Sequence, residues 1–163
     1  MKRPTAAASG TATLLLAAVL TGCSDSTTAE GHGPTASGAS PSAPATVDTK
    51  SEGKLGSILV DDKGNTVYLF LADKKNKSNC TDACAKAWPP LLTKGAAKVG
   101  DGVNKKLLDV TKRSNGDEQV TYNGHPLYYY AADTKPGQTN GQGLNQFGAE
   151  WYVLDTRGNK VES

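Results

Sequence analysis

The three cysteines are the most reactive side chains of this sequence, and they fall into two settings. Cys23 follows Leu20-Thr21-Gly22, directly behind an apolar run that begins at Leu14. Cys80 and Cys84 lie together in a polar region much later in the chain. A thiol can be acylated, oxidised to a disulfide or used as a soft metal ligand. The surroundings of each cysteine therefore decide its chemistry.

The surroundings of Cys23 predict lipid attachment. Lys2 and Arg3 form a positive start, the apolar segment 14–20 is too short to span a bilayer, and small residues precede the cysteine. We predict that residues 1–22 are a lipoprotein signal peptide and that acylated Cys23 becomes the first mature residue. Each buried acyl methylene contributes ~0.8 kcal/mol, so two or three chains hold a protein on a membrane. The alternative is ordinary secretion, with Cys23 present by coincidence.

Cys80 and Cys84 are the only thiols left after acylation of Cys23, and the predicted location is one where disulfides persist. We predict a disulfide whose main effect is to staple a short loop. An alternative is a redox or copper-handling accessory protein that uses this pair with the distant His125. The absence of the βαβ pattern of a thioredoxin-like domain disfavours that alternative.

Other chemistry has little support in the sequence. It lacks the nucleophile motif Gly-x-Ser-x-Gly, a phosphate-binding glycine loop and a paired-histidine zinc motif. His125 lies between a turn and Pro126, where a solvated hairpin residue is a simpler interpretation than a general base. We therefore predict no enzyme, cofactor or metal site. A calcium site among Asp61, Asp62 and Asp82 stays open, although the EF-hand spacing is absent.

Charge gives no support for a nucleic-acid partner. The chain has 18 Lys and Arg, and removing Lys2 and Arg3 leaves 16, which balances the 16 Asp and Glu. Nucleic-acid binding needs a concentrated basic surface, which this balance does not suggest. A small cluster of Lys74, Lys75 and Lys77 is interpreted as a solvated loop, with a site for an anionic wall polymer or a lipid headgroup as the alternative.

Composition divides the mature chain into a tether and a domain. Residues 24–52 are rich in Ser, Thr, Ala, Gly and Pro, with Val47 as the only large aliphatic residue. We predict that residues 23–52 are the lipidated cysteine and a flexible tether with a root-mean-square span of roughly 30 Å. All tyrosines, tryptophans and phenylalanines lie between Gly53 and Ser163. About 110 residues suffice for one small core.

Strand patterns dominate residues 53–163 and predict a mainly β, antiparallel domain. The segments with this pattern are 57–60, 66–71, 119–122, 127–131 and 151–154. Asn123-Gly124 is the favoured pair for a two-residue hairpin turn. One short helix is predicted over 82–87, beside the cysteine pair, with Asn79 or Thr81 as its cap.

The domain repeats itself with an offset of 60 residues. The units are predicted at about 56–92 and 116–155, and each contains a turn, an aromatic strand, an aspartate, a loop and a tryptophan. We predict that two such units pack with pseudo-symmetry around one core. The matching pairs are Gly64 and Gly124, Tyr68 and Tyr128, Phe70 and Tyr130, Asp73 and Asp133, and Trp88 and Trp151.

The aromatic segments carry a family resemblance. Tyr68-Leu-Phe70-Leu-Ala-Asp73 and Tyr128-Tyr-Tyr130-Ala-Ala-Asp133 resemble the Tyr-x-aromatic-x-x-Asp repeat of a family of predicted bacterial secreted lipoproteins. Cys80-Thr-Asp-Ala-Cys84 and Gly141-Gln-Gly143, which precede the two tryptophans, are also similar to this family's loop regions. The resemblance spans essentially the whole domain. It implies an envelope lipoprotein repeat and assigns no biochemical activity.

The repeated residues have either a structural or a ligand-binding interpretation. Asp73 and Asp133 are expected to accept loop backbone N–H groups, with ligand contact as the alternative. The two-residue period places Tyr68 on the face of Phe70, and Tyr128 on that of Tyr130, with Tyr129 on the opposite face.

At least one of the three adjacent tyrosines 128–130 is expected to meet solvent. Together with Trp88 or Trp151, such a ring could line a shallow groove for a glycan or quinone. Core packing is the alternative for each ring. We thus predict a membrane-anchored, non-catalytic binding module at the cell envelope, with a glycan, quinone or protein as its partner.

Overall fold

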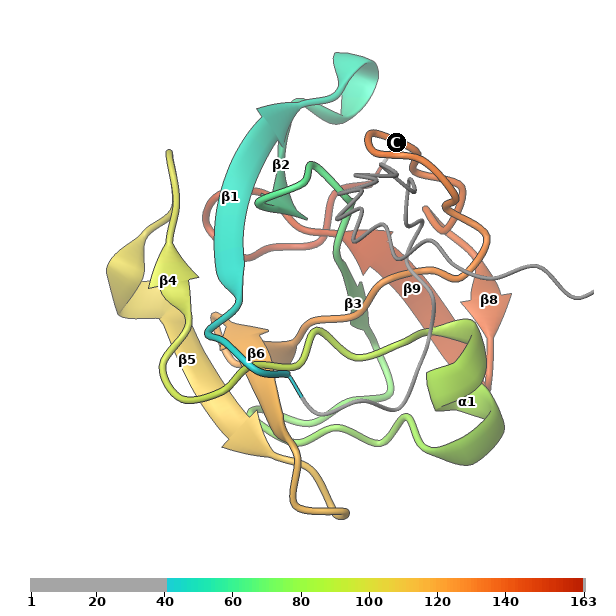
Figure 1. Cartoon of the computed structure of the whole chain (residues 1–163). Helices are drawn as coiled ribbons and strands as arrows, with labels where there is room; N and C mark the ends of the chain where they lie inside the picture. The colour runs from blue at the N-terminus through green and yellow to red at the C-terminus, as the bar shows by residue number, and fades with distance from the viewer. Residues whose placement is uncertain (1–40, 163) are drawn as a thin grey trace, which may run out of the picture. The chain divides into compact units, whose positions relative to one another are not determined.

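The computed structural model describes residues 41–162, so the predicted signal peptide, Cys23 and the first part of the predicted tether lie outside the described residues. These residues form a mainly β domain with three small sheets, ordered β2-β1-β4, β3-β9-β8 and β5-β6-β7 (Figure 1). The strands are β1 (Thr46–Ser51), β2 (Ser57–Asp61), β3 (Tyr68–Phe70), β4 (Lys98–Val99), β5 (Leu108–Lys112), β6 (Glu118–Tyr122), β7 (His125–Pro126), β8 (Asn145–Gln146) and β9 (Ala149–Val153). The helical elements are α1 (Asp82–Ala87) and the 3-10 turns η1 (Gly53–Leu55) and η2 (Lys105–Leu107).

The predicted boundary at residue 53 is wrong, because β1 lies inside the segment that was assigned to the tether. Val47 is fully buried and opposes Asp61 in an antiparallel pairing of β1 with β2. One inward aliphatic side chain is enough for this strand, since most of its other side chains are partly or fully exposed. The same strand pairs with β4 in parallel, which departs from a purely antiparallel domain.

The predicted turn and helix are both present. Asn123 and Gly124 have φ angles of 50° and 82°, as a type I′ hairpin turn requires. Helix α1 spans the predicted residues, and Thr81 occupies its N-cap position without a side-chain capping bond. Asn79 does not cap the helix either, because its side-chain amide donates to the Ala72 carbonyl at 2.6 Å.

The two repeats are interleaved rather than set side by side. Strand β3 of the first unit pairs with β9 of the second, with Phe70 opposite Trp151. The segment around Tyr128 pairs in turn with Pro90 of the first unit. This segment forms isolated bridges, so the predicted long strand over 127–131 is wrong in its length. At the centre, the backbones of Tyr68 and Tyr128 exchange hydrogen bonds of 2.8 and 3.0 Å.

The aromatic segments bury opposite faces in two core clusters. Tyr68, Phe70 and Tyr128 contribute to one cluster, which also contains the disulfide and both tryptophans. Leu69 lies in the other cluster, and Tyr129 packs against it. The side chains therefore alternate as the two-residue period predicts, and both faces of these segments are covered.

Candidate functional site

The repeated tyrosines and aspartates form a reciprocal exchange between the two units. The Tyr68 hydroxyl donates to Asp133 Oδ2 at 2.5 Å, and the Tyr128 hydroxyl donates to Asp73 Oδ2 at 2.6 Å. Each carboxylate also accepts a backbone N–H from its own loop, from Asn79 at 2.6 Å in the first unit and from Asn140 at 3.0 Å in the second. The aspartates thus have the turn-building role expected from the sequence, and they also join the repeats.

Burial sets the protonation of this exchange. Desolvation raises the pKa of Asp73 to about 6, although the hydrogen bonds from Tyr128 and from the Asn79 backbone act in the opposite direction. Desolvation also raises the pKa of Asp133. The pKa values of Tyr68 and Tyr128 are raised, first by burial and further by the neighbouring carboxylates. The two phenols therefore stay protonated and act as hydrogen-bond donors.

A column of four stacked rings runs beside the exchange. Phe70 stacks on Trp151 with a centroid distance of 4.1 Å, the two indoles stack at 3.9 Å, and Trp88 stacks on Tyr130 at 4.3 Å. The rings alternate between the repeats in matching positions. The two tyrosines of the exchange pack edge-on against the indoles, at 5.4 and 5.2 Å. We call the column and the exchange together the aromatic seam.

The aromatic seam is core, so the predicted ligand groove is wrong for its tryptophans. Trp88 and Trp151 are fully buried, as is Tyr128. Tyr130 is half-buried against Trp88. Tyr129 is also half-buried, and its hydroxyl donates to Asp61 Oδ2 at 3.0 Å. Packing against the partner repeat uses the ring surfaces that a ligand would need.

An exposed aromatic ring does occur, at a position that the sequence analysis missed. Phe147 is 48% exposed and lies in the two-residue turn 147–148 between β8 and β9. Its φ of 57° is in the left-handed region, where such turns favour Asn or Gly. The available signal was a Phe-Gly pair that lies between a short polar segment and a short apolar segment. It was overlooked because Phe147 has no counterpart in the first repeat.

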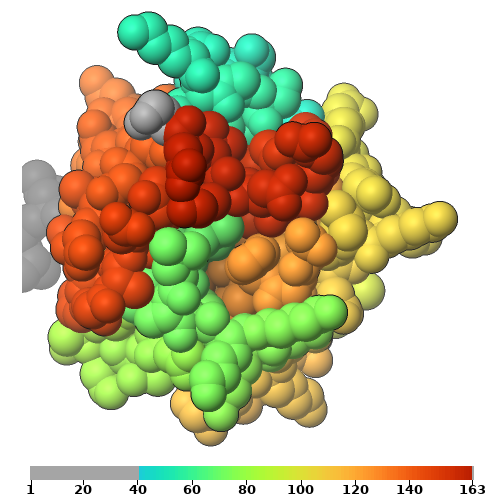
Figure 2. All heavy atoms as spheres, turned by 180° about the vertical axis from the view of Figure 1, so that it is seen from behind, coloured from blue at the N-terminus to red at the C-terminus, as the bar shows by residue number. Residues whose placement is uncertain are grey.

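Phe147 is anchored to the aromatic seam through its neighbour. Gln146 accepts both indole N–H groups, from Trp88 through its side chain at 2.9 Å and from Trp151 through its carbonyl at 3.1 Å. Leu71, 42% exposed, lies at the same end of this sheet because its N–H donates to the Glu150 carbonyl at 3.0 Å. We call Leu71 and Phe147 the turn patch. On the face in Figure 2, the segment that contains β8 and β9 borders the one that follows β3.

The predicted disulfide is present and covered. Cys80 and Cys84 are bonded, with 5.2 Å between their Cα atoms, and they are 0% and 7% exposed. The Arg113 guanidinium holds this loop by donating to the Cys80 carbonyl at 2.6 Å. Burial leaves little sulfur surface for a partner thiol, so this geometry fits a staple better than an exchange site.

The remaining ionisable candidates are used in turns or partly buried. Burial lowers the pKa of His125, which favours the neutral imidazole. Asp61 accepts the backbone N–H groups of Lys63 and Asn65 at 2.9 and 2.8 Å, as expected of a turn-building aspartate. Within residues 41–162, no group of three or more His, Cys, Asp or Glu side chains could hold a metal ion.

The fold and the seam define a class of protein, a small β domain made of two interleaved copies of one unit. The chain belongs to the lipoprotein family described as a secreted repeat of unknown function, whose profile matches residues 49–92 and 109–155. This finding confirms the resemblance and the duplication. No curated protein and no solved structure matches the chain. Across the described part of the chain, helices long and apolar enough to cross a membrane are absent.

Proposed function

We propose that this secreted repeat protein is a membrane-anchored, non-catalytic binding module at the cell envelope, and that its ligand contacts the turn patch. The observation that carries the proposal is the exposed ring of Phe147 in a left-handed turn. A bulky residue at such a φ costs about 1–2 kcal/mol. A half-exposed ring also gains less from burial than a core ring does. Stability therefore does not account for Phe147, whereas ligand contact does.

The chemistry of the turn patch favours an apolar or planar ligand surface. An aromatic face can stack on a sugar ring or on a quinone, and Leu71 adds apolar surface at the same sheet end. The ring lies one residue from Gln146, which is held by two indole N–H groups. A platform supported in this way is pre-organised, so little ordering entropy is lost on binding.

Anchoring through Cys23 supports an envelope location. The sequence features before Cys23 and the secreted character of the family both favour it. Mass analysis of the protein from its native membrane should find an acylated residue 23 as the new N-terminus. Cys23→Ala should move the protein from the membrane fraction to the soluble one. An unmodified N-terminus at residue 1 would contradict anchoring.

The turn patch is tested by Phe147→Asn, with Phe147→Tyr as the matched control. Asn suits the left-handed turn, so this variant should unfold at a higher denaturant concentration than the wild type. Its free energy of unfolding should be higher by about 1 kcal/mol. Titrations with soluble peptidoglycan fragments and a short-chain benzoquinone should show binding to the wild type and to Phe147→Tyr. Phe147→Asn should lose it. Equal binding by all three proteins, or by none, would contradict the turn patch as a site.

A further inference from the structure

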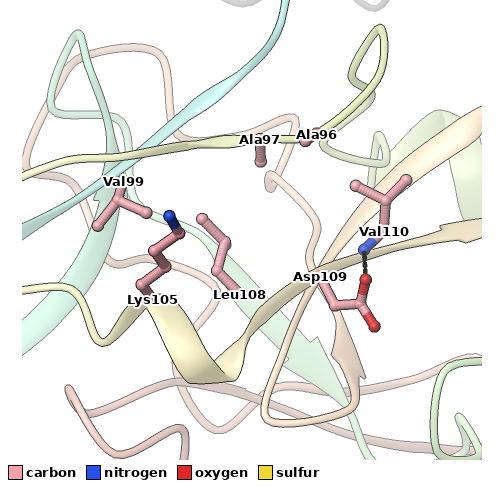
Figure 3. Close-up of a pocket in the computed structure, with 7 residues that line it drawn as sticks. All are labelled: Ala96, Ala97, Val99, Lys105, Leu108, Asp109 and Val110. Carbon is pink, nitrogen blue, oxygen red and sulfur yellow. Dashed lines mark hydrogen bonds between the residues drawn. The ribbon is translucent and has the colours of Figure 1, made fainter.

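Two strand edges face each other on a part of the surface away from the turn patch. β4 is the outer strand of one sheet, and β5 is the outer strand of another. Figure 3 shows that Val99 of β4 and Leu108 of β5 point into one hollow, with Ala97 above it and Val110 further along. Val99 is 40% exposed.

The backbone of both edges has groups that point into this hollow. Leu107 accepts a hydrogen bond from the Asn123 N–H. Hydrogen-bonded and non-hydrogen-bonded pairs alternate along an antiparallel ladder, so the backbone N–H and C=O groups of Leu108 and Val110 point away from β6. On β4, Lys98 donates to Ala45 at 2.7 Å, so the polar backbone atoms of Val99 face away from β1. Such an edge can accept a further strand.

The segment that forms the hollow has an excess of positive charge, while the hollow itself is lined by one cation, Lys105, and one anion, Asp109. Between residues 94 and 112 there are five lysines and two aspartates, all exposed, which gives a local excess of three positive charges. The mature chain as a whole is balanced, with 16 residues of each sign after Lys2 and Arg3 are subtracted. The Lys105 side chain itself lines the hollow between Val99 and Leu108 (Figure 3). A partner with acidic side chains complements this field.

We propose that the hollow between β4 and β5 binds an extended acidic peptide segment, which adds as a strand to the β5 edge. Its backbone pairs with Leu108 and Val110, one row of its side chains lies on the apolar floor, and acidic side chains reach Lys105 and its neighbours. Lys105 and Asp109 then have opposite effects on this peptide. The Asp109 carboxylate accepts the Val110 N–H at 2.8 Å, so it occupies a donor that the peptide needs and repels acidic side chains.

The test is a titration of the full chain with a capped peptide of alternating Glu and Val. It should bind at least about tenfold more tightly than its Lys-Val counterpart, because charge complementarity selects the acidic form. A Glu-Val peptide with N-methylated valines should bind weakly if pairing is through the backbone. Lys105→Glu should weaken binding of the acidic peptide, whereas Lys54→Glu, the same charge change on η1, should not.

Asp109→Ala distinguishes an edge that binds a peptide from an edge that Asp109 merely protects against strand pairing. This variant should bind the acidic peptide several times more tightly than the wild type. Phe147→Asn should leave this binding unchanged, which keeps the result independent of the turn patch. The proposal is overturned if neither peptide binds, if both bind equally, or if Lys54→Glu weakens binding as much as Lys105→Glu. Concentration-dependent dimers that Lys105→Glu abolishes would identify a second copy of the chain as the occupant and also overturn it.

Discussion

The loop between aspartate and tryptophan differs between the two repeats, although both loops begin and end alike. Asp73 and Asp133 each accept a backbone N–H from an asparagine early in the loop. Each loop then ends at an indole of the aromatic seam. The first loop is filled by α1 and the disulfide, whereas the second contains the turn between β8 and β9 with the exposed Phe147.

This difference separates what duplication preserved from what each unit acquired. Apart from the turn glycines Gly64 and Gly124, the matching residues of the two units lie in the aromatic seam, where each one needs its counterpart. The unmatched loops meet no such requirement, so one can be stapled and the other can present a ring to solvent. Changes in the seam should therefore affect folding, and changes in the loops should affect local order or binding.

The largest effect is expected from Trp151→Ala. This indole stacks on Phe70 and Trp88, and its loss leaves a large cavity in the centre of the seam. Truncation of a buried Trp to Ala costs about 3–5 kcal/mol, measurable by denaturant unfolding of the soluble protein. Phe147→Ala is the control from the second loop and should not destabilise comparably. Equal losses would remove the distinction between seam and loop.

A smaller loss is expected from Gly141→Ala. A Cβ at this position would lie 2.7 Å from the Trp88 ring and 2.9 Å from the Tyr68 ring. Overpacking of this kind costs about 1–3 kcal/mol. Gly143→Ala is a matched control, since nothing lies within 4 Å of its Cβ position and only the strain of a φ of +69° applies. Thermal unfolding of both variants should place Gly141→Ala lower, and the reverse order would contradict the tight seam.

Removal of the staple should have a moderate effect. The double change Cys80→Ser and Cys84→Ser releases a loop with a sequence separation of 4, for which chain entropy gives about 2 kcal/mol. Equilibrium unfolding should show this loss, while binding to the turn patch at low temperature stays intact because the patch belongs to other segments. Lost binding in a folded double variant would instead favour a functional role for the cysteine pair.

A pH-dependent effect is expected from Asp73. Its folded pKa is raised to about 6 from 3.8, so the folded state binds this proton more tightly. The contribution is fully present below pH 4 and is lost as the pH rises toward 6. Asp73→Asn should remove this part of the stability profile, measured by denaturation between pH 4 and pH 7. Asp155→Asn should leave the profile between pH 4 and pH 7 unchanged, because desolvation of Asp155 is outweighed by hydrogen bonds from Asn159 and Arg157 that lower its pKa, so its contribution is lost only below pH 4.

Local rules predicted those parts of the fold that neighbouring residues control. The Asn123-Gly124 turn, helix α1 and the Cys80–Cys84 bond follow from short motifs, and the structure has all three. The alternation of the aromatic segments also follows from the strand period. Pairing of matching units could be expected from the offset of 60, but their interleaving could not, because no local pattern specifies which partner a strand selects.

The remaining differences between prediction and structure arose where the average composition of a segment was given more weight than its individual positions. The polar average of residues 24–52 obscured β1, in which a single inward Val47 suffices. Tyr128-Tyr129-Tyr130 indicated an exposed ring, yet packing from both repeats covers these side chains wholly or in part. The exposed ring is Phe147, and its left-handed φ depends on a turn that the sequence alone did not reveal.

A lone unit of this protein would lack the strand partner that its sister supplies. β3 would have no β9 to pair with, and the Tyr68 hydroxyl would have no carboxylate to accept its hydrogen bond. Two separate chains of a single unit could meet these needs for each other as a swapped dimer. Fusion of two such chains into one would convert an association that depends on concentration into a permanent one, and would free each intervening loop to diverge.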